Sequence, residues 1–206
     1  ICHCLVGSEM CIRDSPYIYM GGGVSVGDIN NDDLDDIFFT GNMTQNRLYL
    51  NKGDLKFDDI TDYSGSGGDD RWYTGSTMVD INNDGFMDVV VAITRDLPYY
   101  EGAYIQILFN NGSGELIDVT ESSFSNQPRS ATHHGEGNIY LRDMNLDGNL
   151  DIVHSTRDYN SGYHGSHIAI NDGMGNFTSI ENSKLPDKPD PGYNNYDFLM
   201  KALPIN

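Results

Sequence analysis

The chain has 206 residues, of which 38% are hydrophobic and 11% aromatic, a composition typical of a globular protein rather than a disordered one. Twelve basic residues against 31 acidic ones give a formal net charge of -19, which makes nucleic acid and anionic membranes poor partners and a cation a good one. No apolar run approaches the roughly 18 residues of a membrane span, so we expect no membrane insertion.

The first fifteen residues, ICHCLVGSEMCIRDS, differ from the rest of the chain. They contain all three Cys residues, and they lack the basic start and unbroken apolar stretch of a signal peptide. Cys2 and Cys4 are separated by one residue, which fits no CxxC-type metal or redox motif. We interpret residues 1–15 as a non-native leader of adaptor origin, the alternative being a frayed native N-terminus, and exclude them from the fold.

From residue 16 onward, one arrangement occurs three times. A short apolar stretch leads into an acidic loop, and a dense apolar run follows the loop. The loops begin at Asp28, Asp80 and Asp143. An alternating strand comes next and ends at Asn51, Asn110 or Asn171. A Gly two residues beyond each Asn indicates a tight turn into one more strand.

Each repeat therefore predicts four short β-strands, and no helical periodicity of useful length is present. Four-stranded units that repeat along a chain are typical of β-propeller blades, so we expect an all-β fold, a partial β-propeller. The blades are expected at about residues 16–62, 72–121 and 133–182, and residues 197–206 as the first strand of a fourth blade. Because propellers close with about 4 to 8 blades, we expect a fragment whose partners are the remaining blades of the same chain.

The acidic loops carry Asp or Asn at positions 1, 3, 5 and 9, counted from the first Asp. Alternate side chains of a tight loop point to one centre, and position 7 adds a main-chain carbonyl. Counting one water, about six oxygens result, within the 6–8 that Ca²⁺ accepts, and the absence of Cys and His argues against zinc or copper. We expect about three Ca²⁺ ions. The predicted ligands are Asp28, Asn30, Asp32, Leu34 and Asp36; Asp80, Asn82, Asp84, Phe86 and Asp88; and Asp143, Asn145, Asp147, Asn149 and Asp151.

Position 6 must turn sharply, and Gly85 and Gly148 suit it. The first loop has Asp33 there, which tolerates the left-handed conformation better than most residues, so we expect a working but weaker site. An EF-hand is excluded because position 12 is not Glu and the flanking segments are strands. The alternative is an acidic turn without metal, which leaves three Asp to repel one another.

The sequences GDINNDDLDDIFF, VDINNDGFMDVVV and RDMNLDGNLDIVH, each followed by a strand and an Asn-x-Gly turn, resemble FG-GAP/VCBS repeats. These repeats are the blades of integrin-α-like β-propellers in secreted and surface proteins. The resemblance covers about residues 16–206, and the missing FG and GAP tripeptides favour the broader VCBS group. It implies calcium at the side chains of positions 1, 3, 5 and 9, an extracellular or cell-surface location, and a role in binding rather than chemistry.

The loop between the second and third strands varies in length among the three repeats, and it leaves the blade at the end opposite the acidic loop. Loops of this kind on a rigid scaffold often carry function, so we expect it to contact a glycan or protein ligand. The candidate residues are Arg95, Asp96, Tyr99, Tyr100, Arg157, Asp158, Tyr159, Tyr163 and His164. The alternative is that Arg and Asp pair locally while Tyr packs on the neighbouring blade.

The leading functional hypothesis is a calcium-stabilised extracellular binding or adhesion module. One alternative is a catalytic or non-catalytic part of a secreted polysaccharide-degrading enzyme, and another is a structural spacer in a large surface protein. We predict no catalytic residue and expect no enzyme, because the sequence has no Ser-His-Asp elbow, no P-loop, no HExxH and no carboxylate pair outside the acidic loops.

Overall fold

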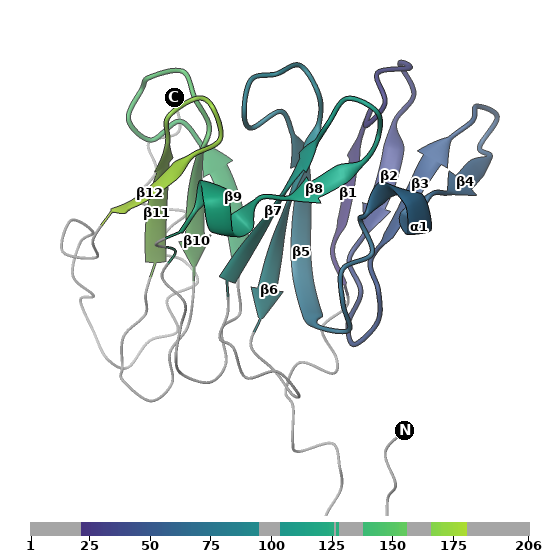
Figure 1. Cartoon of the computed structure of the whole chain (residues 1–206), viewed down its shortest axis with the longest axis horizontal. Coiled ribbons are helices and arrows are strands. Elements are labelled where there is room, and N and C mark those ends of the chain that lie inside the picture. Colours follow the sequence, from purple (N-terminus) through teal and green to yellow (C-terminus); the bar gives the residue numbers. More distant parts are fainter. Residues whose placement is uncertain (1–21, 95–103, 126, 128–137, 156–165, 181–206) are drawn as a thin grey trace, which may run out of the picture.

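The computed structural model describes residues 22–94, 104–125, 127, 138–155 and 166–180. Within these residues the chain forms twelve strands in three four-stranded antiparallel sheets, together with two single-turn helices. Each sheet is a meander in which strands adjacent in sequence are paired. The three sheets stand side by side in chain order (Figure 1).

The first sheet contains β1 (Val24–Gly27), β2 (Asp36–Phe39), β3 (Arg47–Asn51) and β4 (Phe57–Asp59). The second contains β5 (Trp72–Val79), β6 (Asp88–Thr94), β7 (Tyr104–Asn110) and β8 (Leu116–Asp118). The third contains β9 (Asn138–Arg142), β10 (Asp151–Ser155), β11 (Ser166–Asn171) and β12 (Phe177–Ile180). The helices α1 (Thr61–Ser64) and α2 (Thr120–Ser123) follow β4 and β8.

The core lies between neighbouring sheets. One apolar cluster joins Phe38 and Leu48 of the first sheet to Val89 and Val91 of the second. A second cluster joins the opposite face of the second sheet to the third. Strand β6 is therefore covered on both faces, which explains why its sequence is a continuous apolar run rather than an alternating one.

The first strands of the sheets lie next to each other, β1 beside β5 and β5 beside β9. The backbone just before β1 approaches β5 closely, because a Cβ placed on Gly23 would lie 2.6 Å from the Cα of Gly75. Nearby, the hydroxyls of Ser25 and Ser76 are 3.0 Å apart. This packing brings the loops that follow the first strands to the same end of the molecule (Figure 1).

The three four-stranded sheets confirm the all-β fold class expected from the repeats. The two short helices were not expected, because four residues are too few to show apolar periodicity. Each helix starts with a Thr whose hydroxyl accepts the N–H of the third strand, from Leu48 to Thr61 and from Ile107 to Thr120, both at 3.0 Å. Residues 1–15 and 197–206, the expected leader and fourth blade, lie outside the described residues.

Neither of the two helices has the length or apolar character needed to cross a membrane.

Candidate metal centres in the acidic loops

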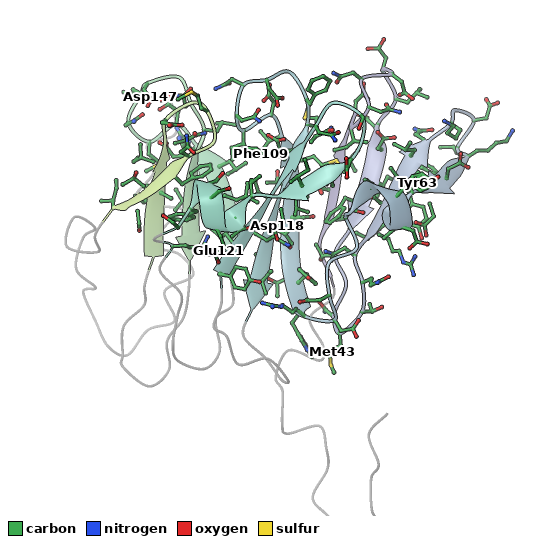
Figure 2. All side chains as sticks on the ribbon, in the orientation of Figure 1. Met43, Tyr63, Phe109, Asp118, Glu121 and Asp147 are labelled. Atoms are coloured by element: carbon green, nitrogen blue, oxygen red, sulfur yellow. The ribbon has the colours of Figure 1, made fainter. Side chains whose placement is uncertain are left out.

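The three acidic loops join β1 to β2, β5 to β6 and β9 to β10, and all three project from one end of the sheets (Figure 1). Figure 2 shows Asp147, in the third loop, at this end and Met43, between β2 and β3, at the other. The segment that joins β2 to β3 therefore leaves from the end opposite the acidic loops.

Positions 1 and 3 direct side-chain oxygens to the same place in every loop. In the first loop, Oδ1 of Asp28 and Oδ1 of Asn30 both accept the N–H of Asp32, at 3.0 and 3.2 Å. Oδ2 of Asp28 accepts the next N–H along the chain, at 2.7 Å. The second and third loops repeat this shared contact. The N–H of Asp84 donates to positions 1 and 3 at 3.1 and 3.0 Å, and the N–H of Asp147 donates to positions 1 and 3 at 3.1 Å each.

Position 5 is held from both sides. Its Oδ1 accepts the N–H of position 7, and its Oδ2 accepts the side-chain amide of position 3. In the third loop these distances are 2.8 Å from Asn149 and 2.8 Å from Asn145. The main-chain bond from Asn149, followed by the amide of Asn145, holds the pKa of the exposed Asp147 carboxyl below its usual value.

Position 9 is the buried member of each loop, because Asp36, Asp88 and Asp151 are all 0% exposed. Each is the first residue of a second strand. Its Oδ2 accepts the N–H of position 2 of the loop, and its Oδ1 accepts the N–H of the Asn that ends the third strand. The Oδ2 distances are 2.9, 3.2 and 2.7 Å to Ile29, Ile81 and Met144. The Oδ1 distances are 2.8, 2.8 and 2.9 Å to Asn51, Asn110 and Asn171.

Negative charge accumulates around this buried carboxyl. The pKa of Asp88 is raised to about 6, first by burial and then by the charges of Asp84 and Asp80, against the lowering effect of its two main-chain hydrogen bonds. The pKa of Asp36 is raised by the same causes, burial first and then the charges of Asp32 and Asp28. Positions 1, 5 and 9 therefore act on one another electrostatically, and a cation placed among them would relieve the repulsion.

The backbone of each loop turns through the left-handed region twice. Position 6 has φ of 65° at Asp33, 91° at Gly85 and 93° at Gly148, which confirms the predicted turn. Position 4, which the sequence analysis did not identify, also has a positive φ, at 57° for Asn31, 60° for Asn83 and 64° for Leu146. The recurrence of Asn at this position in two loops is the signal that would have indicated it.

The loops as described hold their carboxylates on main-chain N–H groups. Among the residues that the structure describes, no three His, Cys, Asp or Glu side chains form a group ready to hold a metal ion. The donor set nevertheless fits a hard cation, because it consists of oxygen alone and each hydrogen-bonded carboxylate oxygen keeps a second lone pair.

The structure also identifies residues whose role the sequence analysis did not recognise. The sequence predicted Asn51, Asn110 and Asn171 only as the ends of strands before an Asn-x-Gly turn, yet each anchors the buried Asp of its own loop. Their recurrence two residues before Gly in all three repeats was the available signal. The predicted ligand-binding residues all lie outside the described residues, and they are Arg95, Asp96, Tyr99, Tyr100, Arg157, Asp158, Tyr159, Tyr163 and His164.

Comparison with known proteins gives a family match and a structural match. Residues 20–91, which contain the whole first sheet and the first two acidic loops, match the model of the FG-GAP-like repeat. A solved structure described as a "putative exo-beta-1,3-galactanase from Bifidobacterium bifidum s17" superposes with a TM-score of 0.43 at 15% identity. The match covers 79% of this chain and 52% of that chain, so this chain spans about half of that protein's length. The chain therefore contains an FG-GAP-like repeat within residues 20–91, and its three four-stranded sheets have the form of β-propeller blades.

Proposed function

We propose that each acidic loop binds one Ca²⁺ ion and that these ions stabilise a binding or adhesion module outside the cell. The observation that carries the proposal is the repeated geometry of the loops. In each of the three loops, the side chains of positions 1 and 3 accept the N–H of position 5, whose own side chain lies in the same loop. A buried Asp at position 9 lies beside them.

The chemistry of the loops supports calcium over softer metals. Side-chain oxygens come from positions 1, 3, 5 and 9, and position 7 supplies a main-chain carbonyl, a set that suits a hard cation of flexible coordination. Burial, and then repulsion from neighbouring Asp residues, raises the pKa of Asp88 and Asp36, and the ion would relieve the repulsion. The ion would share these oxygens with the hydrogen bonds that they already accept, so we expect weak sites matched to the high calcium concentration of extracellular fluid.

The scaffold supports a binding role at its other end. The acidic loops lie at one end of the blades, while the segment between β2 and β3, which contains Met43, lies at the opposite end (Figure 2). Loops carried by a rigid scaffold are common positions for ligand contacts. We propose a glycan or a protein as the ligand, with Arg95 and Arg157 among the contacts.

Thermal unfolding tests the calcium proposal. Protein freed of metal with EDTA should gain several degrees in Tm when millimolar Ca²⁺ is added, because a ligand that binds only the folded state stabilises it. Mg²⁺ at the same concentration should give a smaller shift, since it requires stricter geometry. An unchanged Tm at millimolar Ca²⁺ would contradict the proposal.

A substitution within one loop tests the location of the sites. Asp84 supplies both of its oxygens to contacts inside the second loop, so Asp84→Ala should reduce the number of bound Ca²⁺ ions by one in a calorimetric titration. Asp70→Ala removes the same charge from an exposed position outside the loops and should leave the number unchanged. Equal stoichiometry in the two variants would remove Asp84 from the site.

The binding role has its own test. A glycan array probed with the protein in Ca²⁺ and again in EDTA should give signals that depend on calcium. An array without signal, together with normal calcium stabilisation, would favour the structural-spacer alternative.

A further inference from the structure

We infer that Asn110 and Asn171 join the acidic loops of successive blades into one cooperative unit. Each is a positioning residue that ties the loop of its own blade to the loop of the preceding blade. This inference goes beyond the proposed calcium role and does not depend on it, because every contact that supports it is between protein groups.

Asn110 ends β7, and its side chain reaches the neighbouring blade. Its Nδ2 donates to the carbonyl of Ile29, in the first acidic loop, at 2.6 Å, and to the carbonyl of Met87, in its own loop, at 3.2 Å. Its Oδ1 accepts the N–H of Gly112 at 3.0 Å. Asn110 is 2% exposed, so these bonds are made away from water.

The main-chain contacts of the same residues complete a link between two buried carboxyls. The N–H of Ile29 donates to Asp36 at 2.9 Å, and the N–H of Asn110 donates to Asp88 at 2.8 Å. A continuous path therefore runs from Asp36 through Ile29 and Asn110 to Asp88. Ile29 and Asn110 lie 81 residues apart in the sequence.

The link is repeated between the second and third blades. Asp88 also accepts the N–H of Ile81, at 3.2 Å, and the carbonyl of Ile81 accepts Nδ2 of Asn171 at 2.8 Å. The N–H of Asn171 then donates to Asp151 at 2.9 Å. Because Asp88 belongs to both links, the path crosses all three blades without a break.

Burial makes these bonds costly to break separately. Ile29 is 0% exposed and Ile81 is 1% exposed, so neither carbonyl can replace a lost amide with water while the loop stays in place. A buried polar group left without its partner destabilises the folded state by more than the net stabilisation that one hydrogen bond provides. A displacement of one acidic loop therefore has to disturb the Asn of the following blade, which holds that blade's own buried Asp.

Asn51 provides the matched comparison. Its N–H donates to Asp36 at 2.8 Å, its Oδ1 accepts the N–H of Gly53 at 2.9 Å, and its Nδ2 donates to the carbonyl of Asp35 at 3.0 Å. In the part of the chain that the structure describes, the side-chain bonds of Asn51 stay within the first blade. Asn51 therefore has the role of Asn110 toward its own loop but none between blades.

Hydrogen exchange read by mass spectrometry tests the link, in EDTA so that no metal contributes. Asp28→Ala removes two carboxylate oxygens that accept main-chain N–H groups of the first loop, so it should loosen that loop. We expect amides of residues 80–88, in the second loop, to exchange roughly threefold to tenfold faster in this variant, the effect of about one buried hydrogen bond. Because Nδ2 of Asn31, in the first loop, also donates to the carbonyl of Gly85, in the second, at 3.1 Å, every protein in this comparison carries Asn31→Ala as well. When Asn110→Ala is added, Asp28→Ala should have no further effect on residues 80–88. In an Asn51→Ala background, the effect should persist.

The inference is overturned if Asp28→Ala leaves residues 80–88 unchanged, or if its effect survives in the Asn110→Ala background. Should Asn110→Ala not fold, the unaltered protein gives an independent measurement. As the urea concentration is raised, the free energies of hydrogen exchange of the Ile29, Ile81 and Met144 amides should converge on one isotherm. Three separate isotherms would refute the link. A calcium titration without any effect would leave both readouts intact, so failure of the proposed function is distinguishable from failure of the inference.

Discussion

At the scale of single residues, the acidic loops depend on backbone conformations that most residues avoid. The left-handed region costs an L-residue roughly 1–2 kcal/mol, less for Asn and Asp, and nothing for Gly. The second and third loops place Gly at position 6, while the first places Asp33 there with φ of 65°. The third loop places Leu146 at position 4 with φ of 64°, where the other loops have Asn. These two residues are therefore points of local strain.

Relief of this strain is measurable. Asp33→Gly should raise the free energy of unfolding by roughly 0.5–1 kcal/mol, because Gly adopts the same turn without strain, although part of the gain is offset by the greater freedom of Gly in the unfolded chain. Urea denaturation in EDTA provides the measurement.

A second variant separates backbone strain from charge. Asp33→Gly also removes a negative charge from the first acidic loop, whereas Leu146→Gly removes only an apolar side chain that is 88% exposed. A higher free energy of unfolding in both variants would assign the effect to the backbone. A gain in Asp33→Gly alone would assign it to charge, and no gain in either would refute the argument.

At the scale of secondary-structure elements, the corner between β4 and α1 shows how a blade ends. Asp59, the last residue of β4, accepts the N–H of Thr61 at 3.0 Å, and the hydroxyl of Thr61 in turn accepts the N–H of Leu48 in β3. The second blade builds the same corner from Asp118 and Thr120. A carboxylate, a hydroxyl and one helical turn therefore close the outer edge of each of these two blades.

This corner predicts a pH dependence. The hydrogen bonds from Thr61, side chain first, and the charge of Arg47 hold the pKa of Asp59 below its usual value of 3.8. Because the folded-state pKa is the lower one, the stabilisation is present above about pH 4 and is lost as the pH falls through the folded-state pKa. Asp59→Asn should therefore be less stable than the unaltered protein near neutral pH, and the difference should narrow in acid.

The measurement is urea denaturation at a series of pH values between about 2.5 and 7. Since Asp59 and Arg47 are both exposed, the difference should be small. Asp62→Asn, which removes an exposed charge one residue beyond Thr61, serves as the control. If the difference in stability between Asp59→Asn and the unaltered protein grows in acid, Asp59 is not the group responsible.

At the scale of the whole molecule, the blades are held in place by close approach of backbones as well as by apolar clusters. Gly23 lies against the main chain of Gly75, where a side chain would meet backbone atoms rather than a flexible side chain. Two residues farther along, Ser25 and Ser76 share a hydrogen bond between β1 and β5. The spacing between the first and second blades is therefore set by small residues.

A larger side chain at this contact should push the first and second blades apart. Gly23→Ala places a Cβ 2.6 Å from the Cα of Gly75, so it should destabilise the protein by roughly 1–3 kcal/mol, as overpacking does elsewhere. Gly75→Ala adds the same methyl group where no atom lies within 4 Å, and it should be neutral or slightly stabilising. The midpoints of urea denaturation compare the two variants, and equal effects would refute the packing argument.

The sequence by itself determined the features that depend on neighbours along the chain. The three repeats, the four strands of each and the left-handed turn at position 6 follow from local patterns, because alternation, turn residues and acidic loops are satisfied within a few residues. The hydrogen bonds among positions 1, 3, 5 and 7 are local for the same reason. The ion that the loops bind and the ligand of the opposite end stay predictions.

Only the tertiary structure decided the features that join distant parts of the chain. The sequence marks Asn110 as a turn signal, but its bond to Ile29 exists because two sheets pack side by side. The raised pKa of Asp88 depends on burial, to which the third sheet contributes by covering the far face of β6. Contacts between distant residues depend on which faces pack together, so the path of hydrogen bonds across the three blades appears only once the sheets are assembled.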